Sequence, residues 1–430
     1  MSGSNAGKYM NVLVIGNGGR EHAIAWKIKQ SPLLSTLFCL PGNAGTDSIA
    51  INVPSIITSD SQAIIKFIQE EKIELVIIGP EQPLADGLAD ILISNNIKVF
   101  GPTAAAAKIE SSKGFSKTFM KTSGIPTSDF EIFSEIDQAL KFINNNSEHI
   151  NEYVIKADGL AAGKGVILPN SYNEAVAALN KIMNDKVFGD SGNNVIIEKR
   201  ITGKEVSAHA FSDGNHVIPM PFVCDHKPVF DGNKGPNTGG MGCYSPPQWL
   251  SEELQEIINE EISTKTIKAL STIDIDYAGV LYPGLMINDD SMNVLEYNCR
   301  FGDPETQILL SKLNSDLLEI CVAAAEKKLH NLSIQWDQRP TVGVILASGG
   351  YPGKYETGQE ITGLADVDAD INIFFAGVKR ENDKLLTAGG RVMAVVGSGN
   401  TLHEAREKTY KNVSKIKFDN MHYRTDIGLI

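Results

Sequence analysis

The residues best suited to chemistry lie in one stretch of the chain, VLEYNCRFGDPETQ at Val294–Gln307. Its first residues, VLEYN, predict a strand, because β-branched and large apolar residues favour extended structure. Glu296 and Asn298 are two positions apart, so their side chains leave that strand on the same face. A carboxylate and an amide oxygen side by side suit Mg²⁺. The alternative is an ordinary polar pair at the end of a sheet.

Arg300 stands two residues beyond this pair. Its guanidinium fork matches the geometry of a carboxylate or a phosphoryl group. The residues Asp303, Pro304 and Glu305 then predict the start of a helix, with Asp303 as the capping residue and Pro304 at the first helical position. The stretch therefore combines a predicted metal pair and a predicted anion-binding group at the end of one strand.

A second group of such residues lies in YVIKADGLAAGKGVIL, residues Tyr153–Leu168. Lys156 interrupts a strand of the buried type, where an unpaired charge is costly, so it needs an anionic partner. The loop that follows carries Gly159, Gly163, Lys164 and Gly165. It is not a Walker A loop, because Gly165 occupies the position that requires Ser or Thr. We expect a hairpin that closes over a triphosphate as a mobile lid; a flexible surface hairpin is the alternative.

Two pairs of charged residues flank this hairpin in the sequence. Lys113 and Lys117 are four positions apart on a predicted serine-capped helix, so they share one face. Glu198 and Glu205 are seven apart across a short glycine-containing turn. Such a turn can pass its backbone along an adenine edge while an acid accepts from ribose hydroxyls. Solvated lysines and exposed acids at strand ends are the alternatives.

The segment Phe222–Tyr244 is rich in Gly, Asn and Pro and is predicted to be a long loop. Loops of this length are usually tied to function. Asp225 and Lys227 stand at its start, and the run TGGMG, with Gly239 and Gly240, offers successive backbone N–H groups as an anion nest.

The N-terminal strand Asn11–Gly16 runs into a glycine-rich turn, GNGGRE, and a predicted helix at Glu21–Gln30. A strand, a glycine turn and a helix start together form a phosphate seat. Glu21 holds the position where a dinucleotide-binding turn has its third glycine. The pattern therefore favours a phosphate monoester over NAD, with glycines that merely tighten a turn as the alternative.

Further strands at Glu74–Gly79 and Ile97–Gly101 give βαβ order and predict a doubly wound parallel sheet. Helices are predicted between the strands, at Gln62–Glu71 and Pro83–Ser94. Ligands of such sheets bind at the carboxyl ends of the strands. Asn43 and Glu81 lie in loops at that edge and could bond a sugar, although Glu81 could equally be an ordinary helix-start acid.

Composition narrows the class of protein. The chain has 430 residues, a formal net charge of −13 and five cysteines. The acidic balance argues against a general nucleic-acid or membrane surface, but a pocket can still be locally positive. The cysteines lack a CxxC pair and fit reduced thiols better than disulfides or a zinc site. No apolar run is long enough to span a membrane. We expect a cytoplasmic monomer.

The expected architecture combines α/β and α+β parts. We expect a leader or tag at residues 1–9 and an N-terminal substrate domain at 10–109. A nucleotide-binding region follows at 110–330, with its lid subdomain at about 125–195. Short strands and a helix after residue 331 predict a small α+β domain at 331–430, which shows no cluster of catalytic residue types.

Several of these stretches resemble the ATP-grasp enzymes and, more narrowly, the glycinamide ribonucleotide synthetase family, also called phosphoribosylamine–glycine ligases. The matching stretches are VLVIGNGGREHA, PGNAGT, GPEQPL, FGPT, IKADGLAAGKGV, GPNTGGMG and EYNCRFGDPETQ, with GGYPG and GGRVMAV near the end. The resemblance implies ligation of glycine to 5-phosphoribosylamine with ATP, through a glycyl phosphate, as a step of purine synthesis.

The resemblance also implies a role for each candidate residue. ATP would contact its phosphate lysines, the lid loop and the adenine and ribose edge: Lys113, Lys156, Gly159, Gly163, Lys164, Gly165, Glu198, Lys199, Ile201 and Glu205. Mg²⁺ or Mn²⁺ would be held by Glu296 and Asn298. The two other substrates would contact Gly18, Gly19, Arg20, Asn43, Glu81, Asp225, Lys227, Gly239, Gly240 and Arg300. Of these, Lys113, Lys156 and Arg300 would act in catalysis.

Three alternatives stay open at this point. The chain could be another ATP-grasp ligase with a different carboxylate or amine. Its first βαβ unit could instead belong to an NAD-linked oxidoreductase. It could also be a nucleotide sensor without turnover. None of these readings involves a nucleic acid or a membrane as partner.

Overall fold

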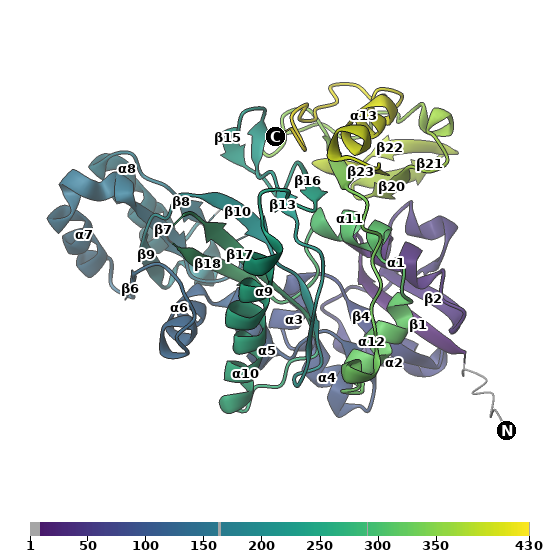
Figure 1. The fold of residues 1–430 in the computed structure, drawn as a ribbon, viewed down its shortest axis with the longest axis horizontal. Coiled ribbons are helices and arrows are strands. Elements are labelled where there is room, and N and C mark those ends of the chain that lie inside the picture. The colour runs from purple at the N-terminus through teal and green to yellow at the C-terminus, as the bar shows by residue number, and fades with distance from the viewer. Residues whose placement is uncertain (1–8, 162–164, 290, 430) are drawn as a thin grey trace.

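The N-terminal part of the chain folds as a five-stranded parallel sheet in the order β3-β2-β1-β4-β5 (Figure 1). This computed structural model describes residues 9–161, 165–289 and 291–429. The strands are β1 Met10–Gly16, β2 Leu34–Pro41, β3 Ile51–Asn52, β4 Ile73–Ile78 and β5 Lys98–Phe100. The helices are α1 Gly19–Ile28, α2 Ser61–Glu70, α3 Glu81–Ala85, α4 Leu88–Ser94 and α5 Ala104–Ser111.

Helices cover both faces of this sheet, as a doubly wound fold requires. Alternate residues of β1 belong to different cores: Val12 and Val14 pack with α1, whereas Leu13 and Ile15 pack with α2 and α4. The helix predicted at Pro83–Ser94 is instead two helices. Gly87 adopts a left-handed φ of 82° between them, a conformation that a continuous helix cannot contain.

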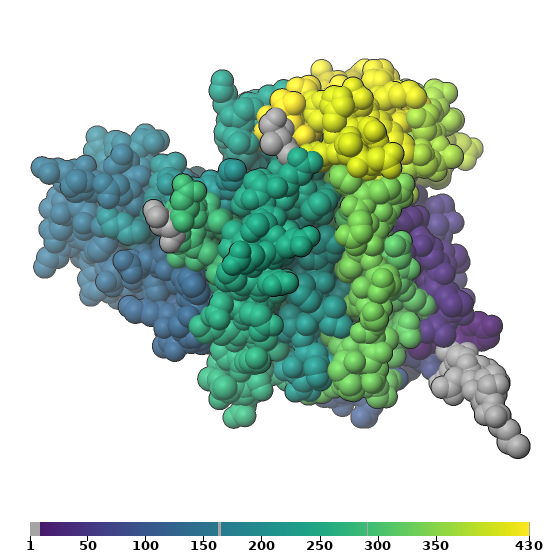
Figure 2. Space-filling view, viewed as in Figure 1, coloured from purple at the N-terminus to yellow at the C-terminus, as the bar shows by residue number. Residues whose placement is uncertain are grey.

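The region predicted as a lid subdomain contains an antiparallel sheet in the order β6-β9-β7-β8, called the lid sheet below after that prediction. Its strands are β6 Phe130–Phe133, β7 Tyr153–Ala157, β8 Val166–Ile167 and β9 Val195–Lys199, and its helices are α7 Ile136–Asn145 and α8 Tyr172–Leu179. A separate small core joins the helices to the sheet, with Ile143, Ile155 and Leu179 fully buried. Figures 1 and 2 show this subdomain as a lobe that projects from the body.

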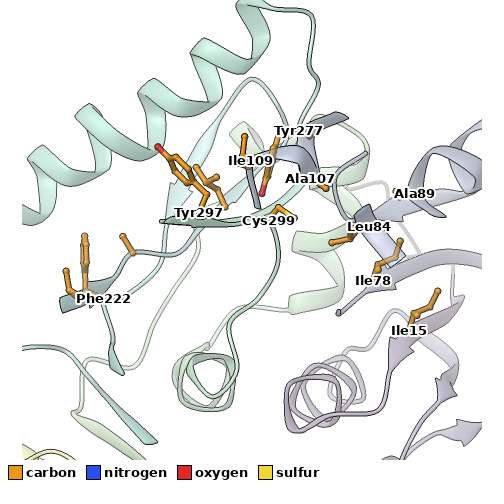
Figure 3. Packing of buried hydrophobic residues seen from close by; sticks show 14 of the residues in the cluster. Ile15, Ile78, Leu84, Ala89, Ala107, Ile109, Phe222, Tyr277, Tyr297 and Cys299 are labelled. Atoms are coloured by element: carbon orange, nitrogen blue, oxygen red, sulfur yellow. The ribbon is translucent and has the colours of Figure 1, made fainter. Parts of the chain in front are cut away.

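The central sheet has the order β10-β17-β11-β12, and β18 pairs with β17. The strands are β10 Lys204–Ser207, β11 Ala210–Ser212, β12 Val217–Pro219, β17 Gly279–Ile287 and β18 Met292–Asn298. One hydrophobic core runs from the parallel sheet to β18. Figure 3 follows it from Ile15 and Ile78 through Ala107 and Ile109 to Cys299 and Tyr297. The position of β18 is therefore set by packing against the N-terminal part.

The last sheet combines two distant parts of the chain, in the order β13-β16-β19-β23-β20. The strands are β13 Cys224–Asp225, β16 Gly242–Ser245, β19 Thr341–Ala347, β20 Asn372–Phe375 and β23 Arg391–Ser398, and α13, Leu402–Val413, packs against β19 and β23. Two hairpins lie beside it, β14 Pro228–Phe230 with β15 Lys234–Asn237, and β21 Val378–Glu381 with β22 Lys384–Thr387. The sheet thus spans the predicted boundary at residue 331, and the long loop predicted at Phe222–Tyr244 is largely short strands.

Five further helices complete the described part of the fold. They are α6 Lys113–Thr122, α9 Glu252–Ile258, α10 Lys265–Thr272, α11 Glu305–Lys312 and α12 Leu317–Ala325. One of them, α11, packs against α1 and the last sheet. The predicted start of α11 is wrong by one position, since Pro304 is the cap residue and Asp303 lies outside the helix. The Asp303 carboxylate instead pairs with Arg391 at 3.1 Å. A distant arginine has replaced the local capping interaction.

Among the described residues, no helix is both long and apolar enough to cross a bilayer.

The shared sheet predicts that the chain cannot be cut at residue 331 without damage. All four residues of β16 pair with β19, and β13 pairs with Cys243 and Tyr244 on the other side. A chain that ends at residue 330 therefore leaves the β19 side of β16 without a partner. Pairs alternate in an antiparallel ladder, and Ile345 N–H donates to Met241 O, so the amides of Cys243 and Ser245 are the ones that face β19. Hydrogen exchange should show rapid exchange of these two amides in the truncated chain, while β17 stays protected as an internal control. Full protection of both amides in that truncated chain would contradict the shared sheet.

Candidate active site

A cavity lies between the lid sheet and β18, with α6 forming part of its wall. Its interior volume is about 100 Å³. Its charged and polar lining comes from α3, α5, α6, β7, β18 and the segment after β18: Glu81, Glu110, Lys113, Ser116, Lys117, Lys156, Glu296, Asn298 and Arg300. Lys156 crosses from β7 to β18, where its Nζ donates to Leu295 O at 3.2 Å. The predicted lid strand and the predicted metal strand therefore face each other.

Glu198 forms ion pairs with two of the lysines. Its carboxylate oxygens lie 2.5 Å from Lys117 Nζ and 2.5 Å from Lys156 Nζ, and all three side chains are buried. Burial by itself would raise the pKa of Glu198, but the two lysines outweigh it and hold that pKa below its usual value. Lys156 thus has the anionic partner that its place in a buried strand requires.

Lys113 is the first residue of α6, a helix capped by the Ser112 hydroxyl. Its Nζ donates to Gly159 O at 2.6 Å, where the lid loop begins. Asp158 fixes this junction, since its carboxylate accepts from the Gly114 N–H at 3.1 Å at the start of α6. Burial lowers the pKa of Lys113, although Glu296 opposes the shift. The lysine and the base of the lid loop are therefore held together.

Glu296 and Asn298 both line the cavity from β18, as the strand period predicts. Leu295 forms a bulge between them and the rest of the strand, because Gly284 pairs with Glu296 and the next residue of β17 pairs with Val294. Bulges re-aim side chains and are common beside active sites.

The chemistry of this pair fits a hard divalent cation. Burial would raise the pKa of Glu296, but Lys156 and the other cations around it outweigh burial and lower that pKa, so the group is ionised. The Asn298 amide nitrogen donates to Tyr282 O at 3.5 Å. The Asn298 Oδ1 atom can therefore coordinate a cation while that hydrogen bond is kept. An ionised carboxylate and an amide oxygen are suitable Mg²⁺ ligands.

Arg300 is clamped between two carboxylates. Its Nη2 lies 2.9 Å from Glu110 Oε1 and its Nε lies 3.2 Å from Glu81 Oε2. Glu81 also lies 3.8 Å from Arg20 Nη1. Burial would raise the pKa of Glu81, but Arg300 and Arg20 lower it to about 2. Glu81 is therefore a helix-start acid that also links the guanidinium of Arg20, on α1, with that of Arg300, just after β18.

Asp225 and Lys227 lie on the segment that begins at β13, and neither of them lines the cavity. Lys227 pairs with Glu205 and lies 3.6 Å from Asp225. Burial, together with nearby Glu305, raises the pKa of Asp225, and Lys227 only partly opposes this. The Oδ1 atom of Asp225 is buried and has no hydrogen-bond partner among the described residues. A buried acceptor without a donor is a natural place for a cationic ligand group.

The residues predicted to line the adenine do not all face the cavity. Glu198 turns its carboxylate to the lysines, so only its backbone could contact a base. Lys199 projects from the opposite face of β9, where its Nζ reaches Glu152 at 3.1 Å and lies over the Tyr153 ring. Ile201 is half-buried after β9 and does not line the cavity. Gly165 lines the cavity, whereas Gly163 and Lys164 lie outside the described residues.

In the glycine turn after β1, the Glu21 carboxylate takes the place expected for a phosphate. The Gly18 N–H donates to Glu21 at 2.7 Å, and the Arg20 Nε lies 2.5 Å from the same carboxylate. A side chain at Gly19 would collide with Gln307. Asn43 anchors its own loop by donating to Asn17 O and Phe375 O, both at 2.8 Å. These groups shape the edge of the sheet, and the structure shows Gly18 and Asn43 already hydrogen-bonded.

The predicted anion nest is likewise engaged. The Gly239 N–H donates to the Tyr351 hydroxyl at 3.1 Å and the Gly240 N–H donates to the Thr238 hydroxyl at 3.0 Å. Arg391, from β23, donates to Gly239 O at 2.7 Å. The C-terminal part of the chain therefore contacts the predicted nest through Arg391, a residue outside the predicted site set.

With this geometry in place, comparison with known proteins is informative. Three profiles of phosphoribosylglycinamide synthetase match the chain in order, the N domain at residues 10–110, the ATP-grasp (A) domain at 111–306 and the C domain at 341–430. The phosphoribosylamine–glycine ligase of Salmonella typhimurium is 45% identical over 423 residues, covering 97% of this chain and 98% of that protein. The chain belongs to the phosphoribosylglycinamide synthetase family.

Solved structures agree with this assignment. The phosphoribosylamine–glycine ligase of Thermotoga maritima superposes with a TM-score of 0.85 at 34% identity, over 97% of this chain and 100% of that one. The biotin carboxylase domain of a Hydrogenobacter thermophilus 2-oxoglutarate carboxylase, solved with MgADP and bicarbonate, gives a TM-score of 0.74 at 15% identity, over 96% and 91% of the two chains. That second likeness concerns the fold alone. The predicted family and fold class are confirmed. This chain therefore contains the ATP-grasp domain of that family.

Sequence reasoning missed several residues of the site. Glu110 and Asp158 each bind a predicted residue or its neighbour, and Arg391 donates to the predicted nest. Lys117 was expected to share a helix face with Lys113 but was given no role in the site. The others have no local signal, because their partners are distant in the sequence.

The Glu198 ion pairs predict a large effect on stability. Glu198→Gln leaves two buried lysines without a carboxylate, and breaking a buried pair costs about 3–5 kcal/mol. Denaturant unfolding should show a loss in the free energy of unfolding of about that size. Glu131→Gln, at an exposed position of the adjacent strand β6, should change it by less than about 0.5 kcal/mol. Equal stability of the two variants would contradict this role of Glu198.

Proposed function

We propose that this chain joins glycine to 5-phosphoribosylamine in an ATP-dependent reaction, through a glycyl phosphate, to give glycinamide ribonucleotide, ADP and phosphate. Relatives with this activity in their names match the whole chain. The observation that carries the proposal is the cavity itself, in which Lys113 and Lys156 lie opposite the oxygen pair of Glu296 and Asn298. An acid-activating ligase needs cations on one side of a triphosphate and a metal on the other.

ATP would enter between the lid sheet and β18. Its phosphates would replace Gly159 O as the partner of Lys113 and would accept a bond from Lys156, which Glu198 orients. The adenine would lie along the backbone that follows β9, with Glu205 near the ribose. Mg²⁺ or Mn²⁺ held by Glu296 and Asn298 would neutralise phosphate charge. Closure of the glycine loop would exclude water from a reactive acyl phosphate.

Glycine would sit between Asp225 and Arg300. The unpartnered Asp225 oxygen would accept from the ammonium group, and the guanidinium of Arg300 would hold the carboxylate or its phosphate. The carboxylate oxygen attacks the γ-phosphorus, and ADP leaves. The chain's contribution here is position and charge, since cations placed at the phosphates stabilise the transition state by a few kcal/mol, roughly a factor of 10² or more in rate.

Phosphoribosylamine would bind at the carboxyl ends of β1, β2 and β4. A hollow there is lined by Asn17, Asn43, Asp47, Lys379 and Arg380, which offers both amide groups for hydroxyls and cations for a phosphate. The pairs Arg20–Glu81 and Glu81–Arg300 connect this edge with the cavity. The amine would then attack the glycyl carbonyl carbon, and phosphate would leave as the amide forms. A monomer in the cytoplasm remains our expectation for the working enzyme.

The experiment that tests this function measures ADP release with glycine, freshly prepared 5-phosphoribosylamine, ATP and Mg²⁺, omitting each in turn. ADP should appear at the full rate only with all four present. Release with a different amino acid in place of glycine would point to another carboxylate–amine ligase. Nucleotide binding without any release would point to a sensor. Either result would overturn the proposal.

The metal assignment predicts the behaviour of Glu296→Ala. Removing the charged oxygen should lower kcat by at least about 100-fold, because the phosphates lose a positioned cation. The melting temperature should change little. Asn293→Ala, on the same strand outside the cavity, serves as the control and should keep wild-type turnover. Wild-type activity of Glu296→Ala would remove the assignment.

The clamp on Arg300 predicts that its shape matters as well as its charge. Arg300→Lys keeps the charge but loses the fork that reaches Glu110 and Glu81 together, so activity should fall by about tenfold or more. Steady-state kinetics with varied glycine would measure this. The control is Arg339→Lys, an exposed arginine paired with Asp337. Unchanged kinetics in Arg300→Lys would mean that a point charge suffices.

A further inference from the structure

Two exposed histidines meet a buried aspartate, and none of the three lines the active-site cavity. Asp213 and His216 lie in the tight turn between β11 and β12. His330 belongs to a short helical turn, Leu329–Asn331, that follows α12. The two imidazole rings have their centroids 5.0 Å apart. Nothing in the proposed reaction uses these three residues.

Their ligand atoms have the spacing of a metal site. One ligand atom from each of Asp213, His216 and His330 lies within 4.8 Å of the others. His216 Nδ1 is 3.3 Å from Asp213 Oδ2, which is longer than an ordinary N–H···O bond. It is also about the edge of a tetrahedron whose bonds to the metal are about 2.0–2.1 Å. His330 is exposed, so a change of its side-chain rotamer can bring its imidazole onto the same centre.

The aspartate is already fixed for such a role. Its side chain is fully buried, and its Oδ1 accepts from the backbone N–H groups of Asn215 at 2.9 Å and His216 at 2.7 Å. Its Oδ2 accepts from the Leu329 N–H at 3.0 Å, across to the turn that carries His330. These donors hold the carboxylate in place, as outer-shell hydrogen bonds do for metal-bound carboxylates.

We propose that Asp213, His216 and His330 form a binding site for a borderline divalent cation such as Zn²⁺. Two imidazoles and one carboxylate select such ions, whereas Mg²⁺ prefers an all-oxygen set. The site is therefore chemically distinct from the oxygen pair of Glu296 and Asn298. With three protein ligands, a fourth position stays open to water.

The bound cation would cross-link two segments that are distant in the sequence. It would tie the β11–β12 turn to the end of α12, where the chain leaves the central region toward β19. A ligand that binds only the folded state stabilises it. The expected effect is therefore on thermal stability, with no change in turnover under Mg²⁺. This inference does not rest on the proposed function, so either can fail without the other.

Other exposed histidines of the chain provide matched controls. His403 lies 3.2 Å from Glu407, and His149 lies 3.0 Å from Glu152. Each of these pairs supplies one imidazole and one carboxylate, and neither joins a third ligand in the described part of the chain. They therefore test whether any exposed histidine beside an acid would bind the ion as well.

The experiment uses the untagged full-length chain in excess Mg²⁺. Calorimetric titration with Zn²⁺ should show a single site, and Co²⁺ should give the visible absorption of a tetrahedral complex. His330→Ala should weaken Zn²⁺ binding by at least about tenfold, a lower bound set by the loss of outer-shell groups. It should also remove the rise in melting temperature that Zn²⁺ causes. His403→Ala should bind Zn²⁺ and respond to it like the wild type.

His330→Ala should fold, since the imidazole is exposed and its recorded contact is the ring of His216. Its circular dichroism and its melting temperature in EDTA should match those of the wild type. Retention of the same Zn²⁺ site by a His216→Ala/His330→Ala double variant would overturn the inference. Absence of Zn²⁺ binding by the wild-type chain in excess Mg²⁺ would overturn it as well.

Discussion

The structure depends on keeping several cations close together in a buried cleft before any nucleotide arrives. Glu198 makes this possible, because its carboxylate faces both Lys117 and Lys156 at 2.5 Å. Without that shared carboxylate, two ammonium groups brought together in a low-dielectric interior would repel each other strongly or lose their protons. The same principle recurs at Arg300, which two carboxylates clamp. A ligand with several negative charges can then replace a few protein contacts without the cleft having to assemble itself.

Three features of the fold place these charges: a continuous core, a separate small core and the polar contacts of one arginine. The continuous core from the parallel sheet fixes β18, and a bulge at Leu295 re-aims the side chains of its end. The lid sheet has its own small core, so it can act as a separate body on one wall of the cleft. Arg391 connects the last sheet to Asp303 and to the backbone at Gly239. The C-terminal part is therefore tied to the segment after β18 and to the predicted nest, although no catalytic pattern marks it in the sequence.

Much of the site could be predicted from local rules. The period of a strand put Glu296 and Asn298 on one face, and the need of a buried lysine for an anion held for Lys156. The same period also indicates that Lys199 points away from Glu198, so the two side chains could not line one pocket. What local rules could not supply are the partners that lie far away in the sequence. Asp303 is an example: it pairs with Arg391, which is 88 positions away in the sequence, and does not cap α11.

The most direct test of the account is a crystal structure of the chain with a non-hydrolysable ATP analogue and Mg²⁺. The account predicts a triphosphate between β7 and β18, in contact with Lys113 and Lys156. The metal should be held by Glu296 and Asn298. A nucleotide bound elsewhere, or a metal that avoids both oxygen ligands, would contradict the central claim.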